Sequence, residues 1–150
     1  MEIKFWKFSF CVLLACMLFS CDIVERDGDW TPMIWEKVDY PRTGEVYQVP
    51  ASGSTLTFSC QNYSRYWFSH AKEDGQEVLP PYIDYLAYPL IYGDYFRAEI
   101  HDNKLSIVFE PNEGAHARNT YITVTAGDIF YTFKFIQATS DPSIDPRPWH

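Results

Sequence analysis

The sequence predicts an all-β domain, an antiparallel β-sandwich of about seven or eight strands. Apolar and polar residues alternate in several short segments, as they do in strands with one buried face. Turn-forming residues separate these segments, most of which recur roughly every 8–12 residues, and no segment has a convincing helical period. With 150 residues, 47% hydrophobic and 21% charged, the chain has the size and composition of one globular domain.

Seven segments carry the strand pattern, and an eighth, 33–38, is expected to be either a first strand or a segment that covers the domain. In segment 54–60, for example, Leu56 and Phe58 alternate with threonine and serine. Gly127 separates the last two segments, where a tight hairpin needs a residue at positive φ. The seven expected strands are 45–49, 54–60, 66–71, 95–100, 105–110, 120–125 and 129–137.

The alternation also predicts the core. Segments 66–71 and 129–137 carry bulky apolar residues on both faces, so the inward face of these two stays open. The Pro-rich segment 139–150 cannot join a sheet and is expected to be a tail. The expected core residues are Leu56, Phe58, Trp67, Phe96, Ile107, Ile122, Val124, Phe133 and Phe135.

Residues 1–20 read as an export signal, with two lysines before an apolar run of about 12 residues, too short to span a membrane as a helix. The run ends in Leu-Phe-Ser-Cys, which resembles the lipobox of bacterial lipoproteins, so Cys21 is the expected lipidation site. Cys16 ends a rival Leu-Leu-Ala-Cys lipobox, but its apolar run is shorter. An ordinary signal peptide or a short single-pass anchor is the other alternative.

The lipoprotein resemblance implies attachment to the cell envelope of a Gram-negative bacterium through the N-terminal lipid alone, at the outer membrane and with possible surface exposure. Residues 21–44 then form an acidic tether and lead-in. Acidic residues after Cys21 resemble surface-export signals. Asp22 alone would instead indicate inner-membrane retention in enterobacterial systems, and a plain solvated linker explains the same composition.

The charge of the chain argues against some partners. The formal net charge is −8 and the sequence pI is about 4.8, which disfavours nucleic acid, because phosphate binding depends on clustered lysine and arginine. Once the signal is cleaved and Cys21 is acylated, Cys60 remains alone and cannot form an internal disulfide. Its place in an alternating strand predicts a buried, unreactive thiol.

Residues 45–138 resemble a BACON-type domain. Segment 49–58, Val-Pro-Ala-Ser-Gly-Ser-Thr-Leu-Thr-Phe, resembles the opening of this family, and Trp67 falls where its core tryptophan is expected. Segment 118–125, followed by Phe-Ile-Gln-Ala at 135–138, resembles its closing hairpin. The resemblance implies an immunoglobulin-like sandwich that binds carbohydrate or mucin or serves as a spacer. This chain departs from the family in a long insertion and in having no catalytic domain attached.

The insertion, residues 79–95, is rich in tyrosine. The spacing of its tyrosines is that of one helix face, but Pro89 breaks a continuous helix, so a short helix over 81–87 and a turn are expected. Tyrosine rings with nearby carboxylates suit the faces and hydroxyls of sugars. Alternatively, the rings cap the end of the sandwich core. The expected ligand-binding residues are Tyr82, Asp84, Tyr85, Tyr88, Tyr92 and Asp94.

Signals for catalysis are absent from the sequence. It has no nucleophile elbow, zinc-protease motif, phosphate-binding glycine loop or cysteine pair, and the four histidines lack metal-ligand spacing. The acidic pair Glu73 and Asp74 is expected in an exposed turn. We therefore expect no enzyme, catalytic residue, metal or cofactor. The expected function is carbohydrate binding by a lipid-anchored surface protein; the alternative is a structural or protein-interaction module of a surface assembly.

Overall fold

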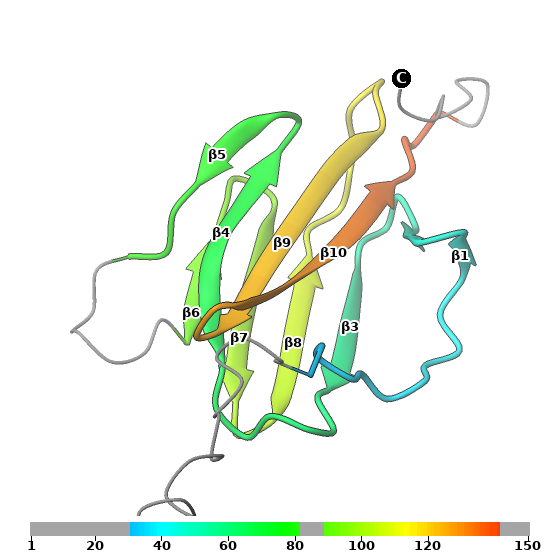
Figure 1. Cartoon of the computed structure of the whole chain (residues 1–150). Helices are drawn as coiled ribbons and strands as arrows, with labels where there is room; N and C mark the ends of the chain where they lie inside the picture. Colours follow the sequence, from blue (N-terminus) through cyan, green and yellow to red (C-terminus); the bar gives the residue numbers. More distant parts are fainter. Residues whose placement is uncertain (1–30, 82–88, 142–150) are drawn as a thin grey trace, which may run out of the picture. The chain divides into compact units, whose positions relative to one another are not determined.

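The computed structural model describes residues 31–81 and 89–141, and within these ranges the protein has ten β-strands and no helix (Figure 1). The all-β expectation is confirmed for this part of the chain. No helix there is long and apolar enough to cross a membrane. The expected features outside the described residues are the signal at 1–20, Cys16, Cys21, Tyr82, Asp84, Tyr85, Tyr88 and residues 142–150.

The strands are β1 Arg42–Thr43, β2 Val46–Val49, β3 Ser54–Ser59, β4 Trp67–Glu73, β5 Gln76–Val78, β6 Leu90–Tyr92, β7 Phe96–His101, β8 Lys104–Phe109, β9 Arg118–Ala126 and β10 Ile129–Gln137. They form a six-stranded sheet in the order β1-β2-β10-β9-β4-β5 and a four-stranded sheet in the order β3-β8-β7-β6. All seven expected strands are present, with ends that shift by one or two residues.

One strand pair contradicts the expectation of a purely antiparallel fold. β2 pairs with β10 in parallel, with Val46 opposite Lys134 and Val49 opposite Gln137. A parallel pair requires a long connection, and here the connection is the whole chain between β2 and β10. Alternation within a segment indicates which side chains face inward. It carries no information on the direction of the neighbouring strand.

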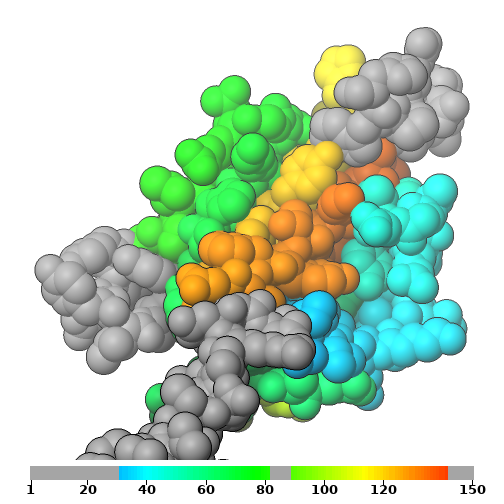
Figure 2. All heavy atoms as spheres, in the orientation of Figure 1, coloured from blue at the N-terminus to red at the C-terminus, as the bar shows by residue number. Residues whose placement is uncertain are grey.

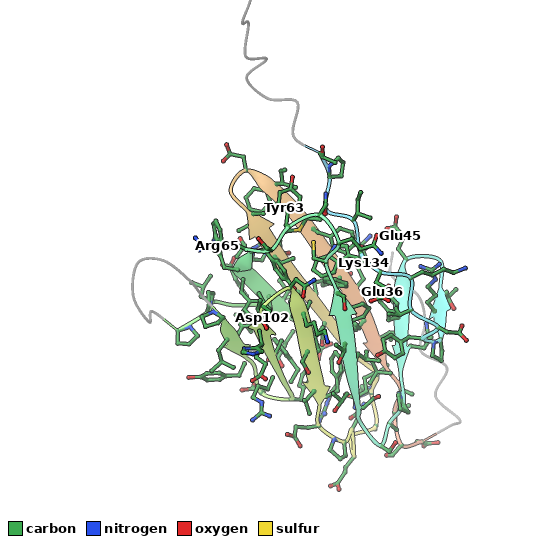
Figure 3. The ribbon with its side chains drawn as sticks, turned by 90° about the horizontal axis from the view of Figure 1, so that it is seen from below. Glu36, Glu45, Tyr63, Arg65, Asp102 and Lys134 are labelled. Atoms are coloured by element: carbon green, nitrogen blue, oxygen red, sulfur yellow. The ribbon has the colours of Figure 1, made fainter. Side chains whose placement is uncertain are left out.

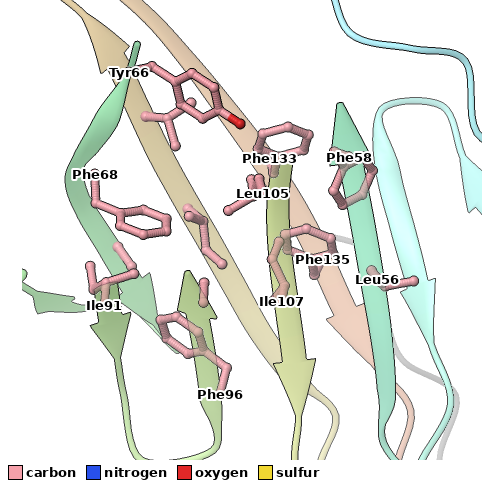
Figure 4. Close-up of a cluster of buried hydrophobic side chains, with 14 of the residues drawn as sticks. Leu56, Phe58, Tyr66, Phe68, Ile91, Phe96, Leu105, Ile107, Phe133 and Phe135 are labelled. Carbon is pink, nitrogen blue, oxygen red and sulfur yellow. The ribbon is translucent and has the colours of Figure 1, made fainter. Parts of the chain in front are cut away.

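Side chains from both sheets form one hydrophobic cluster (Figure 4). Phe58 of β3 has its ring centroid 4.6 Å from that of Phe133 of β10 and 5.0 Å from that of Tyr47 of β2. Eight of the nine expected core residues are buried, and Cys60, also expected to be buried, is 1% exposed. The contacts between Phe58 and β10 join the two sheets, because each aromatic ring removes a large apolar area from water.

Trp67 is the expected core residue that the structure contradicts. It is only partly buried, whereas its neighbour Phe68 is fully buried. The strand register shifts between Phe68 and His70, and such a bulge places two residues opposite one on the neighbouring strand. The inward residues of β4 are therefore Phe68, Ala71 and Glu73, and Trp67 lies on the opposite face of the sheet.

Three short strands were not expected. β5 follows β4 through a hairpin in which Asp74 and Gly75 both have positive φ, at 45° and 87°. β6 lies inside the expected insertion and pairs with β7, which follows the insertion. β1 has only two residues. Strands of two or three residues give too little alternation to recognise. The expected hairpin at Gly127 is confirmed, with φ of 67°.

Residues 31–41, called the covering segment below, run along the free edge of β3. The N–H of Glu36 donates to the Ser59 carbonyl at 2.8 Å, and Trp35 forms an isolated bridge with Cys60. The hydroxyl of Tyr40 accepts a hydrogen bond from the N–H of Thr57 at 3.0 Å. Of the two expectations for 33–38, the covering role is confirmed. The segment shields an edge that would otherwise present unpaired backbone groups.

Candidate binding surface at the base of the insertion

Two expected ligand-binding residues lie among the described residues, and both are exposed. Tyr92, the last residue of β6, keeps 54% of its surface exposed, and Asp94 lies in the turn that follows. Ile91, the residue before Tyr92 in β6, is fully buried. Since side chains alternate along a strand, Tyr92 faces outward from the four-stranded sheet.

A buried carboxylate holds the turn that carries Asp94. Glu73 of β4 is 7% exposed, and its Oε2 accepts the N–H of Asp94 at 2.9 Å. Its Oε1 accepts the N–H of Tyr95 at 3.2 Å. These bonds link the six-stranded sheet to the turn between β6 and β7 of the other sheet. The expectation that Glu73 is an exposed turn acid is therefore wrong.

Gly93 makes this contact possible. A Cβ atom at this position would lie 2.2 Å from Cδ and Oε1 of Glu73, far inside van der Waals contact. The turn is also closed by a hydrogen bond from the Gly93 N–H to the Phe96 carbonyl at 3.0 Å. The glycine is thus required by the close approach of a side chain from another sheet, a reason that no local pattern reveals.

Asp74 and Tyr95 form a second link beside the first. The hydroxyl of Tyr95 donates to Oδ2 of Asp74 at 3.1 Å, and Oδ1 of Asp74 accepts the N–H of Asn119 at 2.8 Å. The guanidinium of Arg118 lies 4.6 Å from the centre of the Tyr95 ring, a cation–π distance. Burial, and then the negative charge of Asp74, raise the pKa of Tyr95 above its usual value. The turn is therefore held at two points, through Glu73 and through Asp74.

The outer face beside Tyr92 is polar. Arg97 lies opposite Tyr92 on β7, and Glu99, two residues further along, lies opposite Leu90. On such a face, diagonal neighbours are about 7–8 Å apart, so Tyr92 and Glu99 are within the span of one sugar unit. Glu99 also lines a cavity of about 270 Å³, whose other lining residues are Thr57, His101, Asp102, Asn103, Lys104 and Ser106.

This arrangement has the features of a binding surface. Tyr92 offers an aromatic face, and the cavity beside it offers carboxylate, amide, ammonium and hydroxyl groups for hydrogen bonds. Both carboxylate oxygens of Glu73 accept hydrogen bonds from backbone N–H groups, so this side chain has a structural role. Within residues 31–81 and 89–141, no group of three or more His, Cys, Asp or Glu side chains is placed to hold a metal ion.

No protein-family model matches the chain, and no curated protein matches it. A solved structure does match, an NMR structure of a protein from Bacteroides thetaiotaomicron. The two chains are 31% identical, the TM-score is 0.63, and the match covers 80% of this chain and 98% of the other. The chain belongs to the same family as this Bacteroides protein. Because the match covers 80% of this chain, the similarity supports the fold over most of its length.

Proposed function

We propose that the protein is a non-catalytic, lipid-anchored surface protein that binds carbohydrate through the insertion and the outer face beside it. The single observation that carries the proposal is the exposed ring of Tyr92 on the same sheet face as Glu99, which lines a cavity together with other polar residues. A sugar whose C–H face stacks on Tyr92 would present its hydroxyls toward Glu99 and the groups around it. The fixed turn supports the proposal, because a preordered surface loses less entropy on binding.

We also propose that the two sheets form an immunoglobulin-like sandwich. In such a fold, the second, fifth and fourth main strands form one sheet, and the third, sixth and seventh form the other. The chain order here gives the same grouping, β3-β8-β7 against β4-β9-β10. The contacts of Phe58 with β10 support the packing of these sheets face to face. The BACON resemblance of residues 45–138 is consistent with this arrangement.

The test of carbohydrate binding is the variant Tyr92→Ala on a glycan array that includes mucin and plant polysaccharides. We expect binding to weaken several-fold, since one stacked ring contributes about 1 kcal/mol. The melting temperature should stay nearly unchanged, because Tyr92 is more than half exposed. Phe130→Ala is the matched control: Phe130 is 61% exposed but lies on the six-stranded sheet. No array signal from the natural protein would exclude carbohydrate binding.

The second candidate is a protein-interaction module, and the exposure of Leu79 favours it. Leu79 is 66% exposed at one end of the insertion, as Tyr92 is at the other. Exposed apolar groups on both sides of one segment are typical of a protein interface. In that case Leu79→Ser and Tyr92→Ala would both weaken capture of one partner from the cell envelope, while the glycan array would stay blank.

The anchor has its own test. Cys21→Ser should release the protein from the membrane fraction or block its processing, because the thioether to the lipid cannot form on serine. Cys16→Ser is the control and should leave lipid labelling intact. Palmitate labelling that persists in Cys21→Ser and disappears in Cys16→Ser would move the lipid to Cys16.

A further inference from the structure

The covering segment encloses a second cavity, at the edge of the domain formed by β1, β2 and β10. The cavity measures about 300 Å³, at the lower end of small-molecule pockets. Trp35 and Val38 of the covering segment line one side, and Tyr47 of β2 and Tyr131 of β10 line the other. Figure 2 shows the covering segment, in blue, next to the orange surface of β10. None of these residues belongs to the surface around Tyr92.

Three aromatic residues, Trp35, Tyr47 and Tyr131, line the cavity. The centroids of Trp35 and Tyr131 are 5.5 Å apart, and Trp35 is held in place by Phe133 at 4.7 Å and Tyr66 at 5.4 Å. Tyr47 is supported by Phe58 from the opposite sheet. These rings are therefore fixed by the core behind them, and their faces and edges are suited to the C–H face of a single sugar ring.

The rim of the cavity is cationic in an otherwise acidic protein. Lys37 and Arg42 line it together with one carboxylate, Glu36. Among the described residues, the two ion pairs are His101 with Asp102 and Lys134 with Glu45, so neither rim cation is paired. Figure 3 labels Glu36 and both members of the Glu45–Lys134 ion pair. The Glu45 carboxylate is bound to Lys134 at 2.9 Å, which offsets its charge.

One polar group behind the cavity lining lacks a partner. The indole nitrogen of Trp35 is buried and has no hydrogen-bond acceptor among the described residues. The pKa of Tyr131 is raised by burial and then by the nearby Tyr47 and Glu45, and Arg42 and Lys134 oppose this shift. A buried N–H without an acceptor is unfavourable.

We propose that this cavity binds one acidic sugar unit, a six-membered ring that carries a carboxylate, such as a uronic acid. The ring stacks on the aromatic residues of the lining, and the carboxylate pairs with Arg42, whose planar guanidinium can donate two parallel hydrogen bonds. Lys37 adds a second positive charge at the rim. A neutral sugar of the same size keeps the stacking but gains nothing from either cation, so the cavity distinguishes acidic from neutral sugars.

The test is calorimetric titration of the full chain with glucuronic and galacturonic acid, with glucose and galactose as matched neutral probes. We expect the uronic acids to bind at least tenfold more tightly than the neutral sugars, with an affinity that falls as salt is added. Arg42→Gln and Lys37→Gln should each weaken uronic acid binding about fivefold or more. Both side chains are exposed, so neither change threatens the fold.

Arg97→Gln is the control, because Arg97 is an exposed arginine on the other sheet, beside Tyr92. It should bind uronic acids like the natural protein, and so should Tyr92→Ala. The proposal is overturned if no uronic acid binds at about 20 mM, a concentration that detects even millimolar affinity. It is also overturned if neutral sugars bind equally well, or if Arg97→Gln weakens binding as much as Arg42→Gln does. Since the two surfaces share no residue, either proposal can fail while the other stands.

Discussion

Replacing Gly93 with alanine should unfold the domain at a much lower temperature, because the new methyl group collides with the buried carboxylate of Glu73. The added Cβ would lie 2.2 Å from Cδ and Oε1 of Glu73, and 2.3 Å from Oε2. Ordinary contact begins near 3.4 Å. One of the two groups must therefore move by more than 1 Å. The backbone at Gly93 is not in the left-handed region, so the whole effect comes from this collision.

The cost follows from the bonds that Glu73 loses. A shift above 1 Å breaks the hydrogen bonds to Asp94 and Tyr95, now 2.9 and 3.2 Å long. Hydrogen bonds to a charged group contribute about 1.5–3 kcal/mol each, so the loss of both should lower the free energy of unfolding by about 3–6 kcal/mol. For a domain of this size, the melting temperature should fall by roughly 10–20 °C. Thermal unfolding followed by circular dichroism measures both.

A double-mutant cycle with Glu73→Ala separates this cause from others. If the collision is the cause, Gly93→Ala should cost almost nothing once the carboxylate is gone, and the two changes should be strongly non-additive. Gly114→Ala is the control, since its Cβ would meet Asn112 Oδ1 at 3.2 Å, and its cost should stay below about 1 kcal/mol. A melting temperature of Gly93→Ala within about 2 °C of the natural protein, or additive costs in the cycle, would refute the reasoning.

Two tyrosine hydroxyls carry the remaining predictions. Tyr66 is 5% exposed and its hydroxyl has no hydrogen-bond partner in the part of the chain that the structure describes. Tyr66→Phe should therefore leave stability at pH 7 unchanged or raise it by about 1 kcal/mol in urea unfolding, and a loss above 1 kcal/mol would contradict this. Burial and Asp74 raise the pKa of Tyr95 above that of tyrosine in the unfolded chain, about 10. The unfolded chain therefore ionises first, and the stabilisation is complete below pH 10 and lost as the pH rises above it. Urea midpoints between pH 8 and 11 should fall less steeply for Tyr95→Phe than for the natural protein, and equal slopes would contradict this prediction.

The strands could be predicted where one face is buried and the other is wet. In β3, Leu56 and Phe58 are inward and threonine and serine are not, so two residues suffice to fix the phase. In segment 66–71, aromatic residues occupy both phases, and the choice between Trp67 and Phe68 depends on a bulge that only pairing with β9 creates. Sequence patterns fix a phase only when the two faces differ in polarity.

The sequence predicted only part of the candidate site. The many tyrosines of the insertion indicated a surface there, and Tyr92 is exposed. The burial of Glu73 depends on Gly93, which lies 20 positions further along the chain in the turn between two strands of the other sheet. No local sequence signal could therefore reveal it. The cavity beneath the covering segment is harder still, because Trp35, Arg42 and Tyr131 converge from three separate elements.

The link at Glu73 also bears on the proposed binding role of the insertion. β5 belongs to the six-stranded sheet and β6 to the four-stranded one, so the segment between them crosses from one sheet to the other. Glu73 joins the same two sheets directly, through the turn after β6. The position of this turn therefore does not depend on the residues that make the crossing. If a substitution at Tyr82 or Tyr85 leaves the melting temperature unchanged, any change in ligand binding that it causes can be assigned to the binding surface itself.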